Sequence, residues 1–344
     1  MSRSIAGMLR RLARLCVGLV VGAIVALSAA YAIGPERLGP VSLAQYAPYP
    51  VFLVPAATAC LLALFLGWRW RLAAVVALVL VVSQLMGWES GGGEDGPNRF
   101  RVMTWNVKDY ITLTRRGGLA ELAREVSRHN ADVFVLQDAR LLKGASESNP
   151  EAARELFGDR HWWTFGQYTV ASRFPLHQCD TGDIGFRDEA HTYVRCLVTV
   201  YGTDVELVTT HFMTPRFGLS ATRRDPLNGS VKWAANVSDR MTQARTLARD
   251  LARSSRPRIV AGDLNAPGTS LAVRALLDTG LRDAFAAAGT GFGYTWGHSL
   301  RFRVPFLRID HILVSDHFGV ADSFVGGERR SPHRPVIADL TLRR

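Results

Sequence analysis

The fold is decided by the stretch Ala261-Gly262-Asp263-Leu264-Asn265-Ala266-Pro267. It follows Arg258-Ile259-Val260, a β-branched run typical of a buried strand, so we expect Asp263 and Asn265 where that strand ends. Side chains two residues apart on an extended backbone share one face, which suits binding of an oxyanion or a metal-bound water. Because Gly, Asp, Asn and Pro also form turns for local reasons, the stretch taken alone is more simply interpreted as a turn.

Polar residues also end other predicted strands. Buried or alternating strands are predicted over residues 100–106, 132–138, 168–175, 205–210, 309–315 and 335–340. At or beside the ends of five of them stand an amide, an acid or a histidine: Asn106, Asp138, His211, Asp310 and His333. Burying each such group without a partner would cost about 1–3 kcal/mol, so their recurrence indicates that one rim of a sheet carries chemistry.

Helices are predicted over residues 119–129, 150–157, 241–253 and 271–278. The segment between the second and third of these includes residues 213–240, which lack sustained apolar periodicity. It holds Arg216, Arg223, Arg224 and Lys232 among Gly, Pro and Asn. We therefore predict a long surface insertion, and long loops on compact domains are disproportionately functional.

Residues 15–88 are nearly free of charge and contain three predominantly apolar stretches, residues 15–33, 51–67 and 72–87. We predict three transmembrane helices. Arginines lie before the first stretch and between the second and third. By the positive-inside tendency, the N-terminus and the link between the second and third stretches are predicted to be cytoplasmic. Everything after Trp88 is then predicted to lie on the outer side. The first stretch is also compatible with a signal peptide, since Ala29-Ala30-Tyr31-Ala32 supplies small residues near its end.

We therefore divide the chain into an all-α membrane anchor over residues 1–88, a glycine-containing linker over 89–97 and a globular domain over 98–344. The net charge of the 344-residue chain is +11, but residues 1–90 hold seven of the 41 basic residues and only two of the 30 acidic ones. The rest is mildly basic, which favours anionic partners without singling out nucleic acid.

The four cysteines fall into two pairs. Cys16 and Cys60 lie within predicted spans, where burial for packing is the default interpretation. Cys179 and Cys196 lie in segments that resemble neighbouring strands, in a domain predicted to face a compartment that permits disulfides. We expect these two to be bridged if their Cα atoms approach to about 5.5 Å, which the sequence does not show.

Seven short motifs occur in order along residues 98–344. They are Thr104-Trp105-Asn106, Leu136-Gln137-Asp138, Ala171-Ser172-Arg173-Phe174-Pro175, Thr210-His211-Phe212, Gly262-Asp263-Leu264-Asn265, Arg308-Ile309-Asp310-His311 and Ser331-Pro332-His333-Arg334-Pro335. Together they resemble the motifs of the endonuclease/exonuclease/phosphatase superfamily. The resemblance implies an α+β fold, a four-layer α/β/β/α sandwich of two mixed sheets with the site at the sheet ends. It also implies hydrolysis of a phosphoester or phosphoanhydride with a divalent metal, Mg²⁺ or Mn²⁺.

The resemblance assigns Asn106 and Asp138 to the metal, with Asp138 as the main ligand. A hard cation needs few protein oxygens besides water, so one carboxylate is chemically sufficient. Two residues depart from the family pattern. Asp138 stands where Glu is common, and Pro332 replaces the Asp of the usual Ser-Asp-His motif, so a one-metal mechanism is favoured.

The remaining matching residues are assigned to catalysis. His333, oriented by Asp310, resembles the residue that positions or activates the attacking water and contacts phosphate. Asp263 would orient or deprotonate that water, and Asn265 would bind phosphate or help to position the water. His211 matches a histidine that binds phosphate or protonates the leaving group. A phosphate anion repels nucleophiles until its charge is neutralised, which the metal, His211 and His333 would do.

A membrane lipid is the leading substrate hypothesis. It depends on the anchor, the short linker and the segment Arg301-Phe302-Arg303-Val304-Pro305-Phe306-Leu307-Arg308, whose alternating basic and apolar side chains suit a lipid surface or, equally, a strand with one buried face. Arg216 and Arg308 are predicted to bind substrate. The layout resembles that of membrane-anchored members of the superfamily linked to glycopeptide-antibiotic resistance, which implies a polyprenyl (pyro)phosphate or a related envelope lipid.

Two other functions are compatible with the sequence. The first is a membrane-tethered nuclease acting on extracellular DNA, although no dense Lys/Arg stripe with interleaved aromatic residues supports it. The second is a binding module on an old enzyme scaffold, suggested by Asp138 and Pro332. The sequence leaves open the oligomeric state and the choice among monoester, diester and pyrophosphate.

Overall fold

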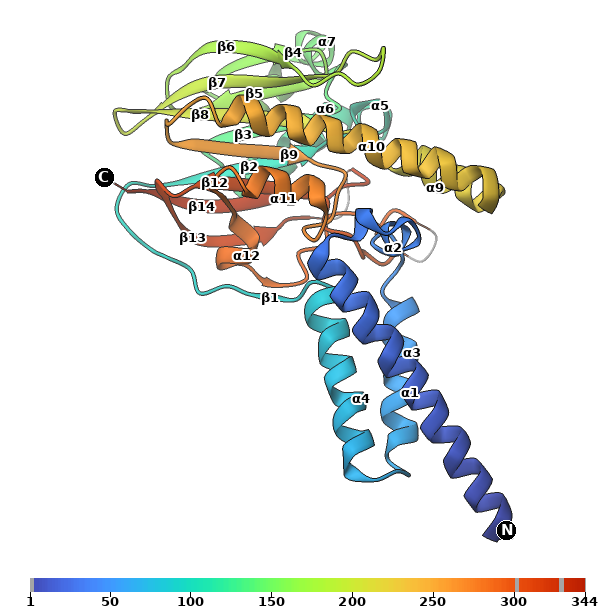
Figure 1. Ribbon diagram of the computed structural model, residues 1–344. Coiled ribbons are helices and arrows are strands. Elements are labelled where there is room, and N and C mark those ends of the chain that lie inside the picture. The colour runs from blue at the N-terminus through green and yellow to red at the C-terminus, as the bar shows by residue number, and fades with distance from the viewer. Residues whose placement is uncertain (1–2, 301–302, 328–330, 344) are drawn as a thin grey trace. The chain divides into compact units, whose positions relative to one another are not determined.

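The computed structural model describes residues 3–300, 303–327 and 331–343 (Figure 1). They form two compact units. One comprises the residues up to Trp88 together with Thr269–Leu271, and the other comprises Glu89–Gly268 and the residues from Ala272 onward. Of the segment predicted to rest on lipid, Arg301 and Phe302 lie outside the described residues.

The first unit consists mainly of apolar helices. They are α1 (Arg3–Ile33), the 3₁₀-helix η1 (Pro35–Arg37), α2 (Gly39–Ala44), α3 (Pro50–Ala63), α4 (Trp68–Leu80) and the π-helix η2 (Val81–Leu85). The small residues Ala59, Ala63 and Ala74 pack around Val17 of α1. Small side chains let helix backbones approach closely, which favours this packing.

Among the described residues, two helices are long and apolar enough to cross a membrane, Ile5–Ile33 and Trp68–Leu85. The helix α3 has only 14 residues. At 1.5 Å per residue it spans about 21 Å, less than the roughly 30 Å of a bilayer core. Its predicted continuation is lost because residues 64–67 form a turn. The prediction of three transmembrane helices is therefore not confirmed.

The second unit contains two six-stranded mixed sheets in its described part. Sheet I has the order β10-β12-β9-β8-β7-β6 and sheet II the order β13-β14-β2-β3-β5-β4. Each has one parallel pair of neighbours, β8 with β9 in sheet I and β2 with β3 in sheet II. The predicted α+β fold with two mixed sheets is confirmed.

The strands agree with most of the predicted ones. Those of sheet I are β6 (Leu176–Asp183), β7 (Thr192–Val200), β8 (Thr203–His211), β9 (Arg258–Asp263), β10 (Leu281–Asp283) and β12 (Asp310–Ser315). Those of sheet II are β2 (Arg99–Asn106), β3 (Val133–Gln137), β4 (His161–Phe165), β5 (Tyr168–Ser172), β13 (Phe318–Val325) and β14 (Val336–Leu342). A short separate pair joins β1 (Glu89–Ser90) to β11 (Thr290–Gly291).

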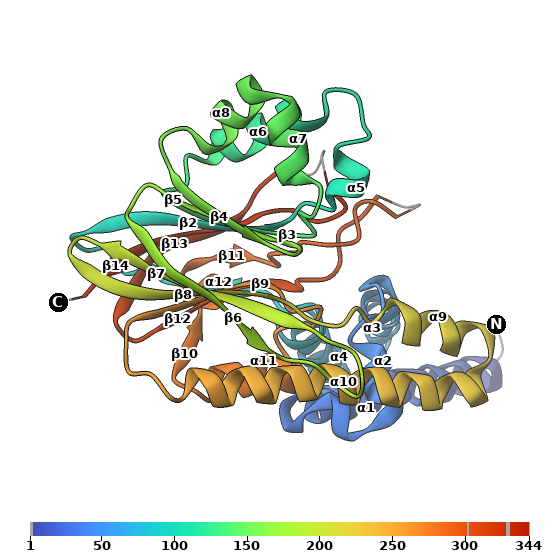
Figure 2. The ribbon, with the colours of Figure 1, turned by 90° about the horizontal axis from the view of Figure 1, so that it is seen from above.

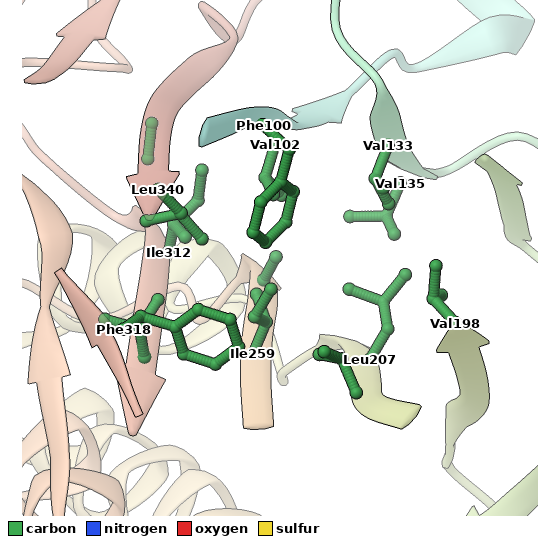
Figure 3. Packing of buried hydrophobic residues seen from close by; sticks show 14 of the residues in the cluster. Phe100, Val102, Val133, Val135, Val198, Leu207, Ile259, Ile312, Phe318 and Leu340 are labelled. Carbon is green, nitrogen blue, oxygen red and sulfur yellow. The ribbon is translucent and has the colours of Figure 1, made fainter. Parts of the chain in front are cut away.

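The central core lies between the two sheets, where Phe100 and Val102 of sheet II face Leu207 and Ile259 of sheet I (Figure 3). The alternation of a strand sends other residues of β2, such as Trp105, to the opposite face. That outer face of sheet II is covered by α6 (Gly118–His129), α7 (Leu142–Ser148) and α8 (Pro150–Phe157). The outer face of sheet I is covered by α10 (Pro226–Leu251) and α11 (Leu271–Leu277). Figure 2 shows the resulting four layers.

The predicted loop over residues 213–240 is wrong. These residues form α9 (Arg216–Arg224) and most of the long helix α10, and the two helices pack against each other. The glycines of this segment favoured the prediction of a loop. In the structure, Gly218 and Gly229 allow the two helices to pack closely. A Cβ on Gly218 would lie 2.9 Å from the Trp233 side chain, and one on Gly229 would lie 2.4 Å from the carbonyl oxygen of Ala221. Two further short helices are α5 (Asp109–Thr112) and α12 (Ala284–Ala288).

The expected disulfide is present. Cys179 on β6 and Cys196 on β7 are bonded, with their Cα atoms 4.1 Å apart. The two strands are antiparallel neighbours, and their register shifts between His177 and Asp180. The bridge therefore links two adjacent strands at the edge of sheet I.

Candidate active site

Three neighbouring strands of sheet I place three predicted site residues in one row. His211 at the end of β8 is opposite Asp263 at the end of β9, and Asp263 is opposite Asp310 at the start of β12. Opposite residues on neighbouring strands share a face of the sheet. From sheet II, Asn106 at the end of β2 donates from Nδ2 to Asp263 Oδ2 over 2.9 Å. The predicted rim lies where the ends of the two sheets meet.

Asp263 is at the centre of this cluster and its residue surface is fully buried. Besides Asn106, two histidines approach its Oδ2 atom. His211 Nε2 lies 3.4 Å away and His333 Nδ1 3.8 Å away. The other oxygen, Oδ1, accepts a bond of 2.9 Å from the backbone N–H of Asn265. Both oxygens of the carboxylate are thus held in place by the surrounding chain.

His333 and Asp310 form a buried pair, with Nδ1 and Oδ2 3.0 Å apart. Burial lowers the pKa of His333 to about 4 and raises the pKa of Asp310 to about 7. His333 is therefore neutral at pH 7. Its Nδ1–H donates to Asp310, which leaves a lone pair on Nε2.

The backbone of His333 is fixed from sheet II. Trp105 donates its indole N–H to the carbonyl oxygen of His333 over 2.9 Å. The hydroxyl of Ser331 accepts from the N–H of His333 and donates to the carbonyl oxygen of Asn106. Ser331 thereby ties the histidine loop to the end of β2, although Pro332 stands where the family commonly has Asp.

His211 is oriented by a side chain that the sequence did not single out. Its Nδ1 lies 2.7 Å from Gln167 Oε1, an atom that only accepts, so the ring proton is on Nδ1. Burial lowers the pKa of His211. The neutral ring then turns an unprotonated Nε2 toward Asp263, so a proton supplied between them would be shared by both groups.

Asp138 follows the end of β3 and lies next to His211, with Oδ1 3.8 Å from His211 Nδ1. Its Oδ2 accepts from the ammonium of Lys108 over 2.5 Å. Burial alone would raise the pKa of Asp138, but His211 and Lys108 outweigh it and lower that pKa. Lys108 is a site residue that the sequence analysis missed, and its position two residues after Asn106 was the available signal.

Asn265 lies beside Asp263 but does not share an extended strand with it. Its backbone is left-handed, with φ of 49°. The side-chain Nδ2 donates to the carbonyl oxygen of Phe212 over 2.9 Å. The expectation that Asp263 and Asn265 stand side by side on one extended face is wrong, because the chain turns immediately after β9.

The two arginines predicted to bind substrate lie in different surroundings. The Arg308 side chain is 12% exposed and donates from Nη1 to Asp283 Oδ2 over 2.6 Å. It belongs to a separate buried group with His311 and is not brought to the cluster around Asp263. Arg216 is exposed at the start of α9, and its charge is among those that lower the pKa of His333. Of the two arginines, Arg216 is the one whose charge acts on His333.

The donors of the cluster fit a hard divalent cation. One ligand atom each of Asp263, Asp310 and His333 lies within 4.8 Å of the others. Asp138 and the amide oxygen of Asn106 add the oxygen ligands that Mg²⁺ and Mn²⁺ prefer. In this described part of the chain, the three carboxyl groups of Asp138, Asp263 and Asp310 lie near one ammonium group, that of Lys108. The carboxyl groups outnumber the ammonium group, so a bound cation would balance the remaining negative charge.

A sequence profile of the Endonuclease/Exonuclease/phosphatase family matches residues 103–333, which include every residue of the cluster. The chain belongs to this family. Its members are phosphoesterases and nucleases, and they generally use a divalent metal. No curated protein sequence matches the chain.

Solved structures share the family fold. The endonuclease/exonuclease/phosphatase from Beutenbergia cavernae DSM 12333 is 21% identical with a TM-score of 0.51, and the match covers 71% of this chain and 72% of that one. The family protein from Bacteroides vulgatus is 19% identical with a TM-score of 0.53, covering 71% and 99%. The D. rerio TDP2 complexed with single strand DNA product is 15% identical with a TM-score of 0.53, also covering 71% and 99%. At these identities the likeness shows the fold alone.

Proposed function

We propose that this protein is a divalent-metal-dependent hydrolase of a phosphoester or phosphoanhydride. One observation carries the proposal. Asp263, fully buried, is bonded by Asn106 and approached by both His211 and His333 where the two sheets end. Burying charged groups without enough opposite charge is costly, so such a cluster is weak as a stabilising device. It suits the deprotonation of water beside an anion.

The roles follow from which atoms carry protons. Asp263, held by Asn106 and the N–H of Asn265, accepts the proton of the attacking water at Oδ2. His211 Nε2, 3.4 Å from that oxygen, takes the proton and passes it to the leaving oxygen. His333, kept in one tautomer by Asp310, presents Nε2 to hold the water in line. Asn265 supports Asp263 and the loop that follows it.

The metal role is proposed for Asn106 and Asp138, with Mg²⁺ or Mn²⁺ as the ion. A bound divalent ion neutralises phosphate charge and polarises the bond that breaks. Asp138 is the most exposed carboxylate of the cluster, with 17% of its side chain accessible, so it is the one that a hydrated ion reaches first. Pro332 supplies no carboxylate, and one ion is therefore proposed.

An envelope lipid phosphate, such as a polyprenyl (pyro)phosphate, is the proposed substrate. Two features support it. Two helices of the first unit have the length and composition of membrane spans. In the second unit, the hairpin of α9 and α10 exposes Phe217, Leu227 and Val231 by 68%, 84% and 70% of their surfaces. A basic and apolar helical surface suits an anionic lipid interface.

The hairpin follows β8, the strand that ends at His211. Its first residue is Arg216, five residues after His211. Over residues 216–232 its other basic side chains are Arg223, Arg224 and Lys232, and its one acid is Asp225. Asp225 is used locally, because it caps α10 by accepting from the N–H groups of Leu227 and Asn228. In Figures 1 and 2 the joined ends of α9 and α10 extend beyond the edge of the sheets.

The proposed layout is an anchor over residues 1–88, a linker over 89–97 and a catalytic domain over 98–344 on the outer side of a cell membrane. The arginines in the N-terminal part of α1 and at the start of α4 support this orientation by the positive-inside tendency. Arg69 and Arg71 lie at the start of α4, next to the turn that joins it to α3. The disulfide between Cys179 and Cys196 is consistent with an oxidising compartment.

A substrate panel tests the function. Full-length protein in detergent is incubated with a polyprenyl pyrophosphate, a polyprenyl monophosphate, a lipid phosphodiester and single- and double-stranded DNA, each with Mg²⁺ and with EDTA. We expect Mg²⁺-dependent phosphate release from a lipid that is lost in Asp263→Asn. Preferential cutting of DNA would instead favour the nuclease, which the basic hairpin also allows. Absence of any hydrolysis would contradict the enzyme proposal.

A paired variant tests the hairpin. Leu227→Ser with Val231→Ser should lower the rate on lipid in vesicles by about threefold to tenfold relative to the rate on a short soluble analogue, because it removes apolar surface from the interface. Ser230→Ala with Ser238→Ala on the same helix is the matched control. Equal changes on the two substrates would contradict a lipid-binding role.

A further inference from the structure

The backbone of the loop between β2 and α5 fixes Lys108 next to Asp138. Both residues are left-handed, with φ of 44° and 50°. The N–H of Val107 donates to the carbonyl oxygen of Gln137, and the N–H of Asp109 donates to that of Asp138. A left-handed conformation costs about 1 kcal/mol or more for a residue with a side chain. The surrounding chain must therefore impose the position of both side chains.

Lys108 contacts both residues that are proposed to hold the metal. Its ammonium donates to Asp138 Oδ2 over 2.5 Å, and its backbone N–H donates to Asn106 Oδ1 over 3.2 Å. The side chains of the ion pair are 11% and 17% exposed. One oxygen of each proposed metal ligand is thus already engaged by the same lysine.

The charges of the cluster also favour a single divalent ion. Asp138, Asp263 and Asp310 bring three carboxyl groups to the cluster, and Lys108 brings one ammonium group in contact with Asp138. The Lys108 ammonium is paired with Asp138, which leaves at most two carboxylates for a cation to balance. A second divalent ion would leave an excess of positive charge close to a buried ammonium, which is unfavourable.

We propose that Lys108 is a positioning residue whose ammonium competes with the divalent cation for Asp138 and limits the centre to one weakly held ion. The inference rests on the proposed function. A purely structural lysine would only neutralise Asp138. In that case its removal would lower stability without any gain in metal affinity, so affinity separates the two roles.

The test is calorimetric titration of MgCl₂ into EDTA-treated, full-length protein in detergent. Lys108→Met should bind Mg²⁺ about tenfold or more tightly than wild type, because it frees an oxygen of Asp138 and removes a like charge. Lys108→Arg keeps the charge and should stay within about twofold of wild type. Lys143→Met, which removes an exposed lysine of α7, is the matched control and should also match wild type.

Folding is checked by thermal unfolding in EDTA. If Lys108→Met does not fold, Lys108→Gln replaces it, because a neutral amide can still donate to Asp138. Unchanged or weaker Mg²⁺ binding in the folded neutral variant overturns the inference while leaving the proposed function intact. No Mg²⁺ binding by wild type or by any variant overturns the proposed function and the inference together.

Discussion

Two aspartate–histidine pairs arise from neighbouring residues of one strand, yet their surroundings differ. Asp310 and His311 are consecutive on β12 and point to opposite faces. Asp310 pairs with His333, and His311 pairs with Asp283, in each case with Nδ1 and Oδ2 3.0 Å apart. The contact distance therefore does not distinguish a catalytic pair from a structural one.

The nearby charges do distinguish them. Burial alone would raise the pKa of Asp283, but the Arg308 guanidinium outweighs it and holds that pKa well below its usual range. The Nε2 atom of His311 lies 3.0 Å from the carbonyl oxygen of Ala266, so both ring nitrogens are used. Near His333 the next charged group is another carboxylate, Asp263. A pair completed by arginine stabilises the fold, whereas a pair beside excess negative charge is suited to chemistry.

The largest contrast is expected in turnover. His333→Ala should lower kcat by about a thousandfold, since it removes the group that holds the attacking water. His311→Ala should retain more than about a tenth of the wild-type kcat per folded molecule. Initial rates normalised to folded protein measure both. Comparable losses in the two variants would contradict the division between a catalytic and a structural pair.

The free energy of unfolding should depend more on the structural pair than on the catalytic pair. Asp283→Asn should cost about 3 kcal/mol of unfolding free energy, because it leaves the charge of Arg308 without its buried partner. Asp310→Asn should cost less than about 1 kcal/mol in EDTA, because it removes a negative charge from a cluster with an excess of them. Chemical unfolding of both variants tests this, and a larger loss for Asp310→Asn would refute it.

The pH dependence of stability sharpens the comparison. His333 has a lowered pKa, so it contributes stability that is lost as pH falls from about 6.5 to 4. Asp310 has a raised pKa, so its protonation adds stability as pH falls through about 7. In metal-free wild type the two effects offset each other. Asp310→Asn should expose a loss of about 2 kcal/mol at pH 5 relative to pH 7.5. Parallel stability curves for the two proteins would show that the pair is not coupled.

Stabilisation by the metal should not depend on the structural pair of Asp283 and His311. At ten times its Kd, Mg²⁺ should stabilise wild type by about 1.4 kcal/mol, and Asp283→Asn by the same increment. Asp138→Ala should lose this increment, because it removes the proposed main ligand. Thermal unfolding with and without Mg²⁺ measures it, and full retention of the increment in Asp138→Ala would place the ion elsewhere.

Much of this arrangement could be predicted because motif residues stand at strand ends. Alternation locates β2, and buried apolar runs locate β3, β8 and β9. The register of sheet I in the structure then sets His211 beside Asp263. Local sequence signals did not predict contacts between side chains that are far apart in the chain. Lys108 has its partner thirty positions away. Arg308 lies just before β12 and was assigned to substrate, but its partner Asp283 holds it elsewhere.

The helices α9 and α10 show a different limit. Their glycines suggested a loop, and only the packing of Gly218 against Trp233 and of Gly229 against the α9 backbone reveals why glycine is needed. The short helix α3 shows a third limit. Apolar residues continue past Ala63, but this composition does not determine where the helix ends. Composition indicates which surfaces are buried, but the ends and contacts of helices depend on neighbours.

The most direct test of the account is the hydrolysis rate of a phosphate-bearing lipid by full-length protein. It should be measured in Mg²⁺ and in EDTA for wild type, Asp263→Asn and Asp283→Asn at a temperature where all three are folded. The account predicts Mg²⁺-dependent hydrolysis by wild type and Asp283→Asn, and a loss of about a thousandfold or more in Asp263→Asn. Hydrolysis that persists in Asp263→Asn, or that is unaffected by EDTA, would contradict it.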